Sequence, residues 1–365
     1  MMKKFFIQSM MLLAAVVMLT ACSDNDDNKN WMSSYTVVNK GVFVLNEGSY
    51  FSQINGSLDF LDLTTNEMKR NLFAAANGRS LGGTPNNAIV LNGRMYIATA
   101  DENRVEVILY PTQHSLASFS VVSPRELATD GRYIYVSSYT GKVTKIDSHT
   151  LAIVGESEVV GANLEGIAVR SGYVYVCNAY APLTEYPYAD YKSEVVKLKA
   201  STLEKEKTIT VVCNPNQLIS SGSTLYLASW GDYGAIPATV QAIDADDEVT
   251  TLTNGRMIAL DGNRLYVVNT TYDANWNEVT NYNIYDLATG TETTFISGSE
   301  IVSPAAIGVD PTTREVFITS YSRDAETGYA SYTTDGYICR YAPSGELIGQ
   351  YVTGVGPGTL VFVGD

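Results

Sequence analysis

Histidine and cysteine are scarce in this sequence, and their scarcity argues against several kinds of chemistry. The 365 residues include two histidines, His114 and His149, and four cysteines. The HExxH and CxxC patterns of metal and redox sites do not occur, nor do the GxSxG and P-loop patterns. We therefore expect no catalytic residues, no metal and no cofactor, and we predict that the protein is not an enzyme.

Positive charge is scarce as well. Lysine and arginine together number 24, against 39 aspartates and glutamates, so the net charge at pH 7 is −15. A chain this acidic is repelled by phosphate backbones and by anionic lipid head groups. This argues against nucleic acid as a partner, and against a membrane that attracts the protein by charge.

No apolar run is long enough to cross a membrane comfortably. The longest, Phe5–Leu19, follows two lysines and has the length of a signal-peptide core. It ends in Leu19-Thr20-Ala21-Cys22, which resembles a bacterial lipobox, so we predict a signal peptide over residues 1–21 and a lipid on Cys22. Residues 22–34 then form an acidic tether, whose Ser and Asp run resembles a surface-export signal. An ordinary signal peptide with a chance cysteine is the alternative.

Helical periodicity is nearly absent after the N-terminus, and short β-type segments take its place. The stretch from Pro124 to Val160 reads as four strands separated by Gly-, Ser- and Asp-rich turns. We place these strands at Leu127–Thr129, Tyr133–Ser137, Val143–Asp147 and Leu151–Ser157. Four antiparallel strands in about 40 residues are typical of one blade of a β-propeller.

This unit recurs along the chain at spacings of about 40 or about 50 residues. The copies are recognised by an anchor aromatic in the second strand, at Phe43, Tyr96, Tyr135, Tyr175, Tyr226, Tyr266 and Phe317. Seven copies predict an all-β, seven-bladed propeller over residues 35–365. A β-sandwich with irregular strands is the alternative, but its strands would not recur at such regular positions. The first copy lacks its inner strand, and the last segment, Gly356–Val363, is expected to supply it and close the ring.

The longer copies carry their extra residues after the second strand, so five insertions should emerge on one face of the ring. These insertions are rich in aromatic residues, although loops usually favour Gly, Pro, Asn, Asp and Ser. Polar residues that open the first strands should rim the central channel on the same face, among them Glu126, Gln217 and Arg256. We predict a ligand-binding surface made of Tyr50, Phe51, Asn86, Asn87, Arg125, Tyr139, Glu165, Tyr180, Asn216, Trp230, Tyr233, Tyr272, Trp276 and Tyr321. Packing of the loops on one another is the competing interpretation.

Other reactive residues lie apart from this face. Both histidines fall in turns between third and fourth strands, on the opposite side. Asp101 and Glu102 read as a solvated pair, and Asp244–Glu248 reads as an exposed turn without the spacing of a calcium loop. Cys177 and Cys213 could form a disulfide or remain as two buried thiols.

The repeat PRELATDGRYIYVSSYTGKVTKID resembles the YVTN-type propeller repeat. The lipobox, the acidic tether and the segment NEGSYFSQINGSLDFLD, Asn46–Asp62, resemble the BtuG group of Bacteroidetes surface lipoproteins. That resemblance implies a protein on the outer face of the outer membrane that binds cobalamin, or a related corrinoid, as a transported ligand. It also implies a TonB-dependent transporter of the BtuB type as partner. A broad, amide-fringed corrinoid would suit an aromatic channel mouth.

Three other functions are compatible with the same pattern. Aromatic platforms also stack on sugars, so a glycan-binding propeller is the first. An enzyme of the lactonase or quinoprotein type is the second, and it would need a metal or quinone in the central channel. An adhesion or scaffold role is the third.

Overall fold

The computed structural model describes Val38, residues 40–273 and residues 278–364. Residues 35–365 form one compact unit. The predictions for the signal peptide, for the lipid on Cys22 and for Trp276 lie outside the described residues. Within the described part of the chain, no helix combines the length and apolar character that a membrane crossing requires.

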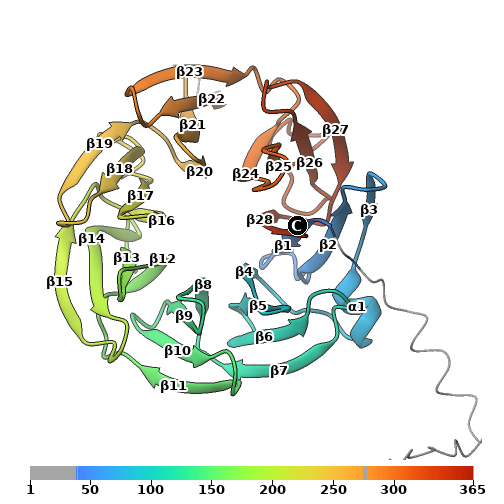
Figure 1. The fold of residues 1–365 in the computed structure, drawn as a ribbon. Helices are drawn as coiled ribbons and strands as arrows, with labels where there is room; N and C mark the ends of the chain where they lie inside the picture. Colours follow the sequence, from blue (N-terminus) through green and yellow to red (C-terminus); the bar gives the residue numbers. More distant parts are fainter. Residues whose placement is uncertain (1–37, 39, 274–277, 365) are drawn as a thin grey trace, which may run out of the picture. The chain divides into compact units, whose positions relative to one another are not determined.

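The strands of the described residues form seven four-stranded antiparallel sheets arranged as blades around a ring (Figure 1). The innermost strands are β28 (Pro357–Val363), β4 (Pro85–Leu91), β8 (Pro124–Thr129), β12 (Asn163–Arg170), β16 (Pro215–Ser221), β20 (Met257–Asp261) and β24 (Ser303–Val309). The second strands are β1 (Gly41–Asn46), β5 (Arg94–Thr99), β9 (Tyr133–Ser138), β13 (Tyr173–Pro182), β17 (Thr224–Ser229), β21 (Arg264–Tyr272) and β25 (Val316–Tyr321).

The outer half of each blade follows the same order. The third strands are β2 (Ser57–Asp62), β6 (Arg104–Leu109), β10 (Val143–Asp147), β14 (Ala189–Lys199), β18 (Thr239–Ile243), β22 (Glu278–Asp286) and β26 (Tyr337–Tyr341). The fourth strands are β3 (Glu67–Lys69), β7 (Ser115–Ser120), β11 (Ala152–Glu156), β15 (Lys205–Thr210), β19 (Val249–Thr253), β23 (Thr291–Ile296) and β27 (Leu347–Val352). The prediction of a seven-bladed propeller is confirmed.

The ring closes as predicted, through the C-terminal strand. β28 pairs antiparallel with β1, with Val361 opposite Phe43, so blade one has the order β28-β1-β2-β3. Val361 and Val363 are buried in the same hydrophobic cluster as Phe43 and Phe60. The two ends of the propeller therefore share one blade and one core.

Apolar side chains fill the spaces between neighbouring blades. One cluster joins Tyr96 and Val105 of blade two to Ile134 and Ile146 of blade three. Both faces of each inner sheet are thus covered, which explains why the strands are hydrophobic on both faces. Six of the seven anchor aromatics are fully buried, and Tyr226 is half-buried.

Three local predictions need correction. A short helix, α1 (Leu72–Asn77), follows blade one's outer strand, so not every insertion follows a second strand. In blade three the first strand already begins at Pro124, because proline fits the first position of a strand, where its missing N–H costs no ladder hydrogen bond. The fourth strand begins at Ala152, because Leu151 has the positive φ of a turn residue.

The turn Asp244–Glu248 is only partly exposed. Asp244 and Asp246 face solvent, but Asp247 is buried. Its carboxylate lies 2.6 Å from Arg170 Nη2 and 2.9 Å from Lys197 Nζ, and both of these cations belong to blade four. Asp247 therefore joins blades four and five rather than contacting water.

Candidate functional site

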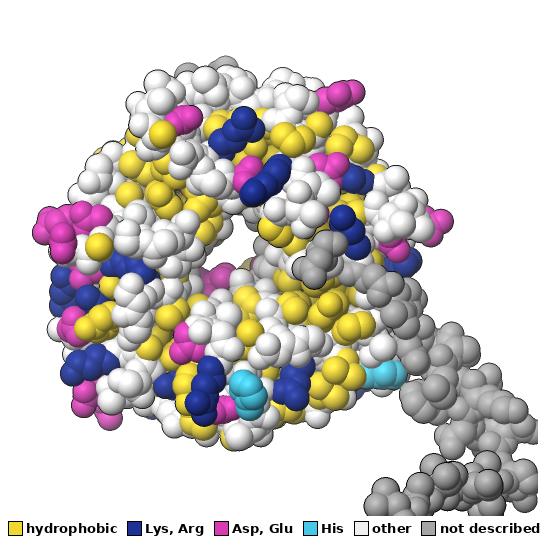
Figure 2. Space-filling view, in the orientation of Figure 1, with side chains coloured by type: hydrophobic (Ala, Val, Ile, Leu, Met, Phe, Trp, Pro, Cys, Tyr) yellow, Lys and Arg dark blue, Asp and Glu magenta, His cyan; other side chains and the backbone are white. Residues whose placement is uncertain are grey.

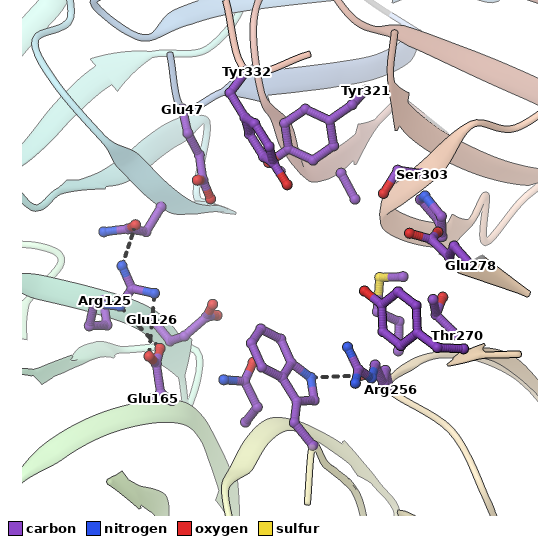
Figure 3. Close-up of a pocket in the computed structure, with 18 residues that line it drawn as sticks. Glu47, Arg125, Glu126, Glu165, Arg256, Thr270, Glu278, Ser303, Tyr321 and Tyr332 are labelled. Atoms are coloured by element: carbon purple, nitrogen blue, oxygen red, sulfur yellow. Dashed lines mark hydrogen bonds and ion pairs between the residues drawn. The ribbon is translucent and has the colours of Figure 1, made fainter. Parts of the chain in front are cut away.

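The central channel opens on the face where the second strands end. Because blade strands alternate in direction, the end of each second strand lies beside the start of each first strand. Figure 2 shows the opening in the ring from the opposite face, the one that carries the histidines, with acidic side chains visible in its wall. A cavity of about 480 Å³ lies at this end of the channel (Figure 3). It is lined by Glu47, Asn86, Arg125, Glu126, Glu165, Asn216, Trp230, Arg256, Met257, Thr270, Tyr272, Glu278, Ser303, Pro304, Ala305, Tyr321, Tyr332 and Gly358.

One wall of this cavity is an interlocked network on blades two to four. Arg125 Nε donates to Glu165 Oε2 at 3.0 Å, and Arg125 Nη1 donates to Asn86 Oδ1 at 2.5 Å. The Arg125 guanidinium lies 4.6 Å from the centre of the Tyr139 ring, and the Tyr139 hydroxyl donates to Glu165. Tyr180 packs edge-on against Tyr139 at 6.0 Å. These side chains therefore hold one another in place through hydrogen bonds and ring contacts.

Burial changes the proton affinity of groups in this wall and of Glu47 beside it, on blade one. Burial opposes the charge of Arg125, but Glu165, Tyr139 and Glu47 together outweigh that effect and raise the pKa of the guanidinium. For the carboxyls of Glu47 and Glu126, burial outweighs the opposing effect of the Arg125 charge. Burial raises the pKa of Glu47 to about 7 and that of Glu126 to about 8. Near neutral pH both carboxyls can therefore donate as well as accept a hydrogen bond.

These raised pKa values predict that the protein loses stability as pH rises. Each carboxyl has a folded pKa above its ordinary value of 4.5, so its contribution is complete below about pH 4.5 and is lost as pH rises through 7 and 8. Glu126→Gln keeps an acceptor for Asn87 Nδ2 but cannot ionise. We expect it to raise the free energy of unfolding above pH 8 by about 1–3 kcal/mol, measured by urea denaturation.

The control for that experiment is Glu326→Gln, which changes an exposed carboxylate in a loop of blade seven. It should leave the difference in stability between pH 5 and pH 9 as it is in the wild type. A Glu126→Gln variant with the same pH dependence as the wild type would contradict the assignment.

The opposite wall, on blades five to seven, is aromatic. Trp230 Nε1 donates to the backbone oxygen of Arg256 at 3.0 Å, and the two tyrosine rings of blade seven, Tyr321 and Tyr332, lie 4.9 Å apart. Tyr272 is 53% exposed at the rim. Figure 3 shows Tyr321 and Tyr332 facing the cavity, across from the Arg125 network. Flat rings that are already fixed in place suit the binding of a broad ligand at low entropic cost.

The structure brings half of the fourteen predicted site residues to this cavity. They are Asn86, Arg125, Glu165, Asn216, Trp230, Tyr272 and Tyr321. Asn87 lies deeper, in an adjoining space of about 240 Å³. Tyr139, Tyr180 and Tyr233 support lining residues or pack beside them, whereas Tyr50 and Phe51 project from the blade-one loop. The self-packing interpretation therefore holds for part of the set.

Several lining residues were not foreseen. Glu47 directly follows β1. It would have been predicted if the residues that follow each second strand had been counted as lining residues. Glu278 begins β22, and Ser303, Pro304 and Ala305 lie at the start of β24. The insertions of blades four and six are largely extended hairpins, in which Pro182 pairs with Ala189 and Tyr272 with Glu278. Because Glu278 pairs with Tyr272 at the end of this hairpin, it also lies at the rim of the cavity.

The cavity offers no arrangement that we recognise as a metal centre. Among the described residues, no group of three or more His, Cys, Asp or Glu side chains could hold a metal ion. The open question of the disulfide is answered, since Cys177, Cys213 and Cys339 are buried free thiols. Burial raises the pKa of the Cys177 thiol well above its ordinary value, which makes it a poor nucleophile.

Comparison with solved structures supports the same fold. The chain is similar to a quinoprotein alcohol dehydrogenase-like protein from Bacteroides thetaiotaomicron, with 17% identity, a TM-score of 0.64, and 89% of this chain and 78% of the other covered. It is also similar to a candidate 6-phosphogluconolactonase from Bacteroides fragilis, with 16% identity, a TM-score of 0.62, and 89% and 98% covered. Identities this low establish the propeller architecture alone.

A third similar structure is the hydrazine synthase of Kuenenia stuttgartiensis, with 16% identity, a TM-score of 0.58, and 75% and 88% covered. No curated protein matches the chain in sequence. Residues 40–351 match a family described as a domain of unknown function, DUF5074. This match spans most of the propeller, and the chain therefore belongs to the DUF5074 family.

Proposed function

We propose that the protein is a cell-surface lipoprotein that captures cobalamin at the mouth of its channel. The observation that carries this proposal is the arrangement of the cavity, which has a volume of about 480 Å³. A hydrogen-bonded polar wall lies on one side of it and an aromatic wall on the other. This volume is within the range of roughly 300–1,000 Å³ that small-molecule sites occupy. A corrinoid is larger, so part of its disc would rest above the ring, among the aromatic loops.

The chemistry of the two walls suits such a ligand. Corrinoids carry several amide side chains around an apolar macrocycle, and these need both hydrogen-bond donors and acceptors. Glu47 and Glu126 can supply either near neutral pH, Asn216 supplies both through its side-chain amide, and Trp230 and Tyr321 offer flat apolar surfaces. The site would bind without chemical change, so we propose a carrier rather than an enzyme.

The remaining parts of the proposal concern location and transfer. The lipid on Cys22 and the acidic tether would hold the propeller on the outer face of the outer membrane. A TonB-dependent transporter of the BtuB type would then receive the ligand. Large apolar side chains at loop tips, including Phe51 at 94% and Tyr186 at 86% exposure, are available for contact with such a partner.

Calorimetric titration of residues 35–365 with cyanocobalamin tests the proposal. This fragment is a compact unit by itself. We expect saturable binding of one cobalamin per protein. An absence of heat at micromolar protein, together with no change in the absorption spectrum of the vitamin, would reject cobalamin as the ligand.

Trp230→Ala should weaken cobalamin binding by about tenfold or more, because tryptophan is enriched among the few contact residues whose truncation costs about 2 kcal/mol or more. Tyr329→Ala is the matched control: Tyr329 belongs to a loop of blade seven, is 75% exposed and does not line the main cavity. The two variants are compared by the same titration. Equal affinities for both variants would show that the ligand does not contact the aromatic wall.

A further inference from the structure

Arg256 is a cation at the channel mouth that forms no ion pair within the described part of the chain. Its Nε is buried without a hydrogen-bond partner. Arg125, the other arginine of the cavity, pairs with Glu165 and is hydrogen-bonded to Asn86. The two arginines occupy equivalent places in their blades, at the start of an inner strand, yet only Arg125 is neutralised inside the protein.

Arg256 is also held in position. Its backbone N–H donates to Val268 at 2.8 Å, and its backbone oxygen accepts the hydrogen bond from Trp230 Nε1. The guanidinium carbon lies 5.0 Å from the centre of the Tyr233 ring. Figure 3 shows Arg256 at the edge of the cavity, on the side of Thr270 and Glu278. The backbone of Arg256 is thus held by two hydrogen bonds, and its guanidinium packs on the Tyr233 ring.

An unsatisfied buried N–H donor costs free energy, and a partly desolvated guanidinium regains it best by a bidentate contact with a carboxylate or phosphate. Glu278 is close enough for Arg256 to favour its ionised form, but the two form no ion pair. The other acidic residues of the cavity are Glu47, Glu126 and Glu165, on blades one, three and four, and Glu165 is already paired with Arg125. Arg256 lines the cavity, so the terminal nitrogens of its guanidinium are the atoms available to an anion that enters from outside the protein.

We propose that Arg256 binds an anionic phosphate group of the ligand and so fixes the orientation of the ligand in the channel mouth. This inference rests on the function proposed above, and it adds the binding mode. The phosphodiester of the nucleotide loop is the anionic group of cobalamin. It would lie at Arg256, over blades five and six, and the corrin ring would extend towards Tyr321 and Glu47.

The test compares cyanocobalamin with dicyanocobinamide, which has the same corrin ring but lacks the nucleotide loop and its phosphate. Arg256→Gln should reduce the affinity for cyanocobalamin by about 10- to 100-fold, as expected for a lost hydrogen bond to a charged group. It should change the affinity for dicyanocobinamide by less than about twofold. Arg256→Lys, which keeps the charge but not the bidentate geometry, should give an intermediate loss for cyanocobalamin alone.

Two controls separate recognition from folding. Arg323→Gln removes an exposed arginine of blade seven that does not line the main cavity, and it should leave both affinities unchanged. Arg256→Gln removes an unpaired charge, so its melting temperature should equal or exceed that of the wild type. An equal loss of affinity for both corrinoids, or no loss for cyanocobalamin, would overturn the proposed contact.

Failure of the proposed function gives a different result. If the wild type binds neither corrinoid, cobalamin capture is rejected, and Arg256 is then tested with inorganic phosphate alone. Millimolar phosphate should raise the melting temperature of the wild type more than that of Arg256→Gln at matched ionic strength. Equal shifts in the two proteins would reject an anion site at Arg256.

Discussion

A chain that ends at Val355, and so lacks β28, should lose its cooperative thermal unfolding transition and form aggregates. β28 pairs along the whole of β1, and its Val361 and Val363 complete the cluster around Phe43. Without it, the ring is open and β1 presents an unpaired inner edge to other chains. Differential scanning calorimetry and size-exclusion chromatography would show the loss of the transition and of the monomer peak.

A chain that ends at Gly364 is the control for this truncation. It retains all of β28 and should melt as the full-length chain does. A synthetic peptide covering residues 356–365, added during refolding, should restore monomer to the truncated chain if strand pairing is what was lost. A truncated chain that melts cooperatively at the wild-type temperature would show that closure by β28 is dispensable.

Asp247→Asn should lower the free energy of unfolding by about 3–5 kcal/mol, since it leaves buried cations without their counter-charge. Asp247 accepts contacts from Arg170 Nη2 at 2.6 Å, Lys207 Nζ at 2.8 Å, Lys197 Nζ at 2.9 Å and the Tyr175 hydroxyl at 3.0 Å. Arg170 and Asp247 are both nearly inaccessible to solvent. Urea denaturation of variant and wild type at pH 7 measures the loss.

The same cluster predicts a specific pH dependence. Burial alone would raise the pKa of Asp247, but hydrogen bonds from Lys207, Lys197 and Tyr175 lower it to about 2. The stabilising contribution is therefore complete above the ordinary value of 3.8 and is lost as pH falls towards 2. Asp246→Asn, in the same turn but exposed, should have little effect at any pH. Equal stabilities of the two variants would show that the cluster contributes no net stability.

The wrong prediction for Asp247 illustrates what local sequence leaves out. Four acidic residues within five positions read as a solvated turn, because nothing nearby in the sequence offers a partner. The cations that neutralise Asp247 lie on blade four, and Arg170 is 77 residues away. Helix α1 was not predicted, because six residues are too few to show a helical period. Its position is set by tertiary contacts, since Leu72 and Phe73 are buried against blade one.

The sequence placed several residues at the channel mouth, where the structure also has them, but it did not show which of them pair with one another. The ends of the second strands and the starts of the first strands are fixed by the repeat, so Asn86, Arg125 and Trp230 could be placed at the channel mouth from sequence. Whether each is free or already paired could not be foreseen. Arg125 and Arg256 have equivalent places in the repeat, yet one is bound by Glu165 and the other has an unpartnered Nε.

The sequence by itself determined the blades, their number and the strand that closes the ring. Strand periodicity, turn residues and anchor aromatics are short-range features, and each blade repeats them independently. Only the tertiary structure decided which charges neutralise one another, which thiols are buried and which loops are extended hairpins. Those outcomes depend on distances between blades that are far apart in the chain, and on the loss of water around the groups that meet there.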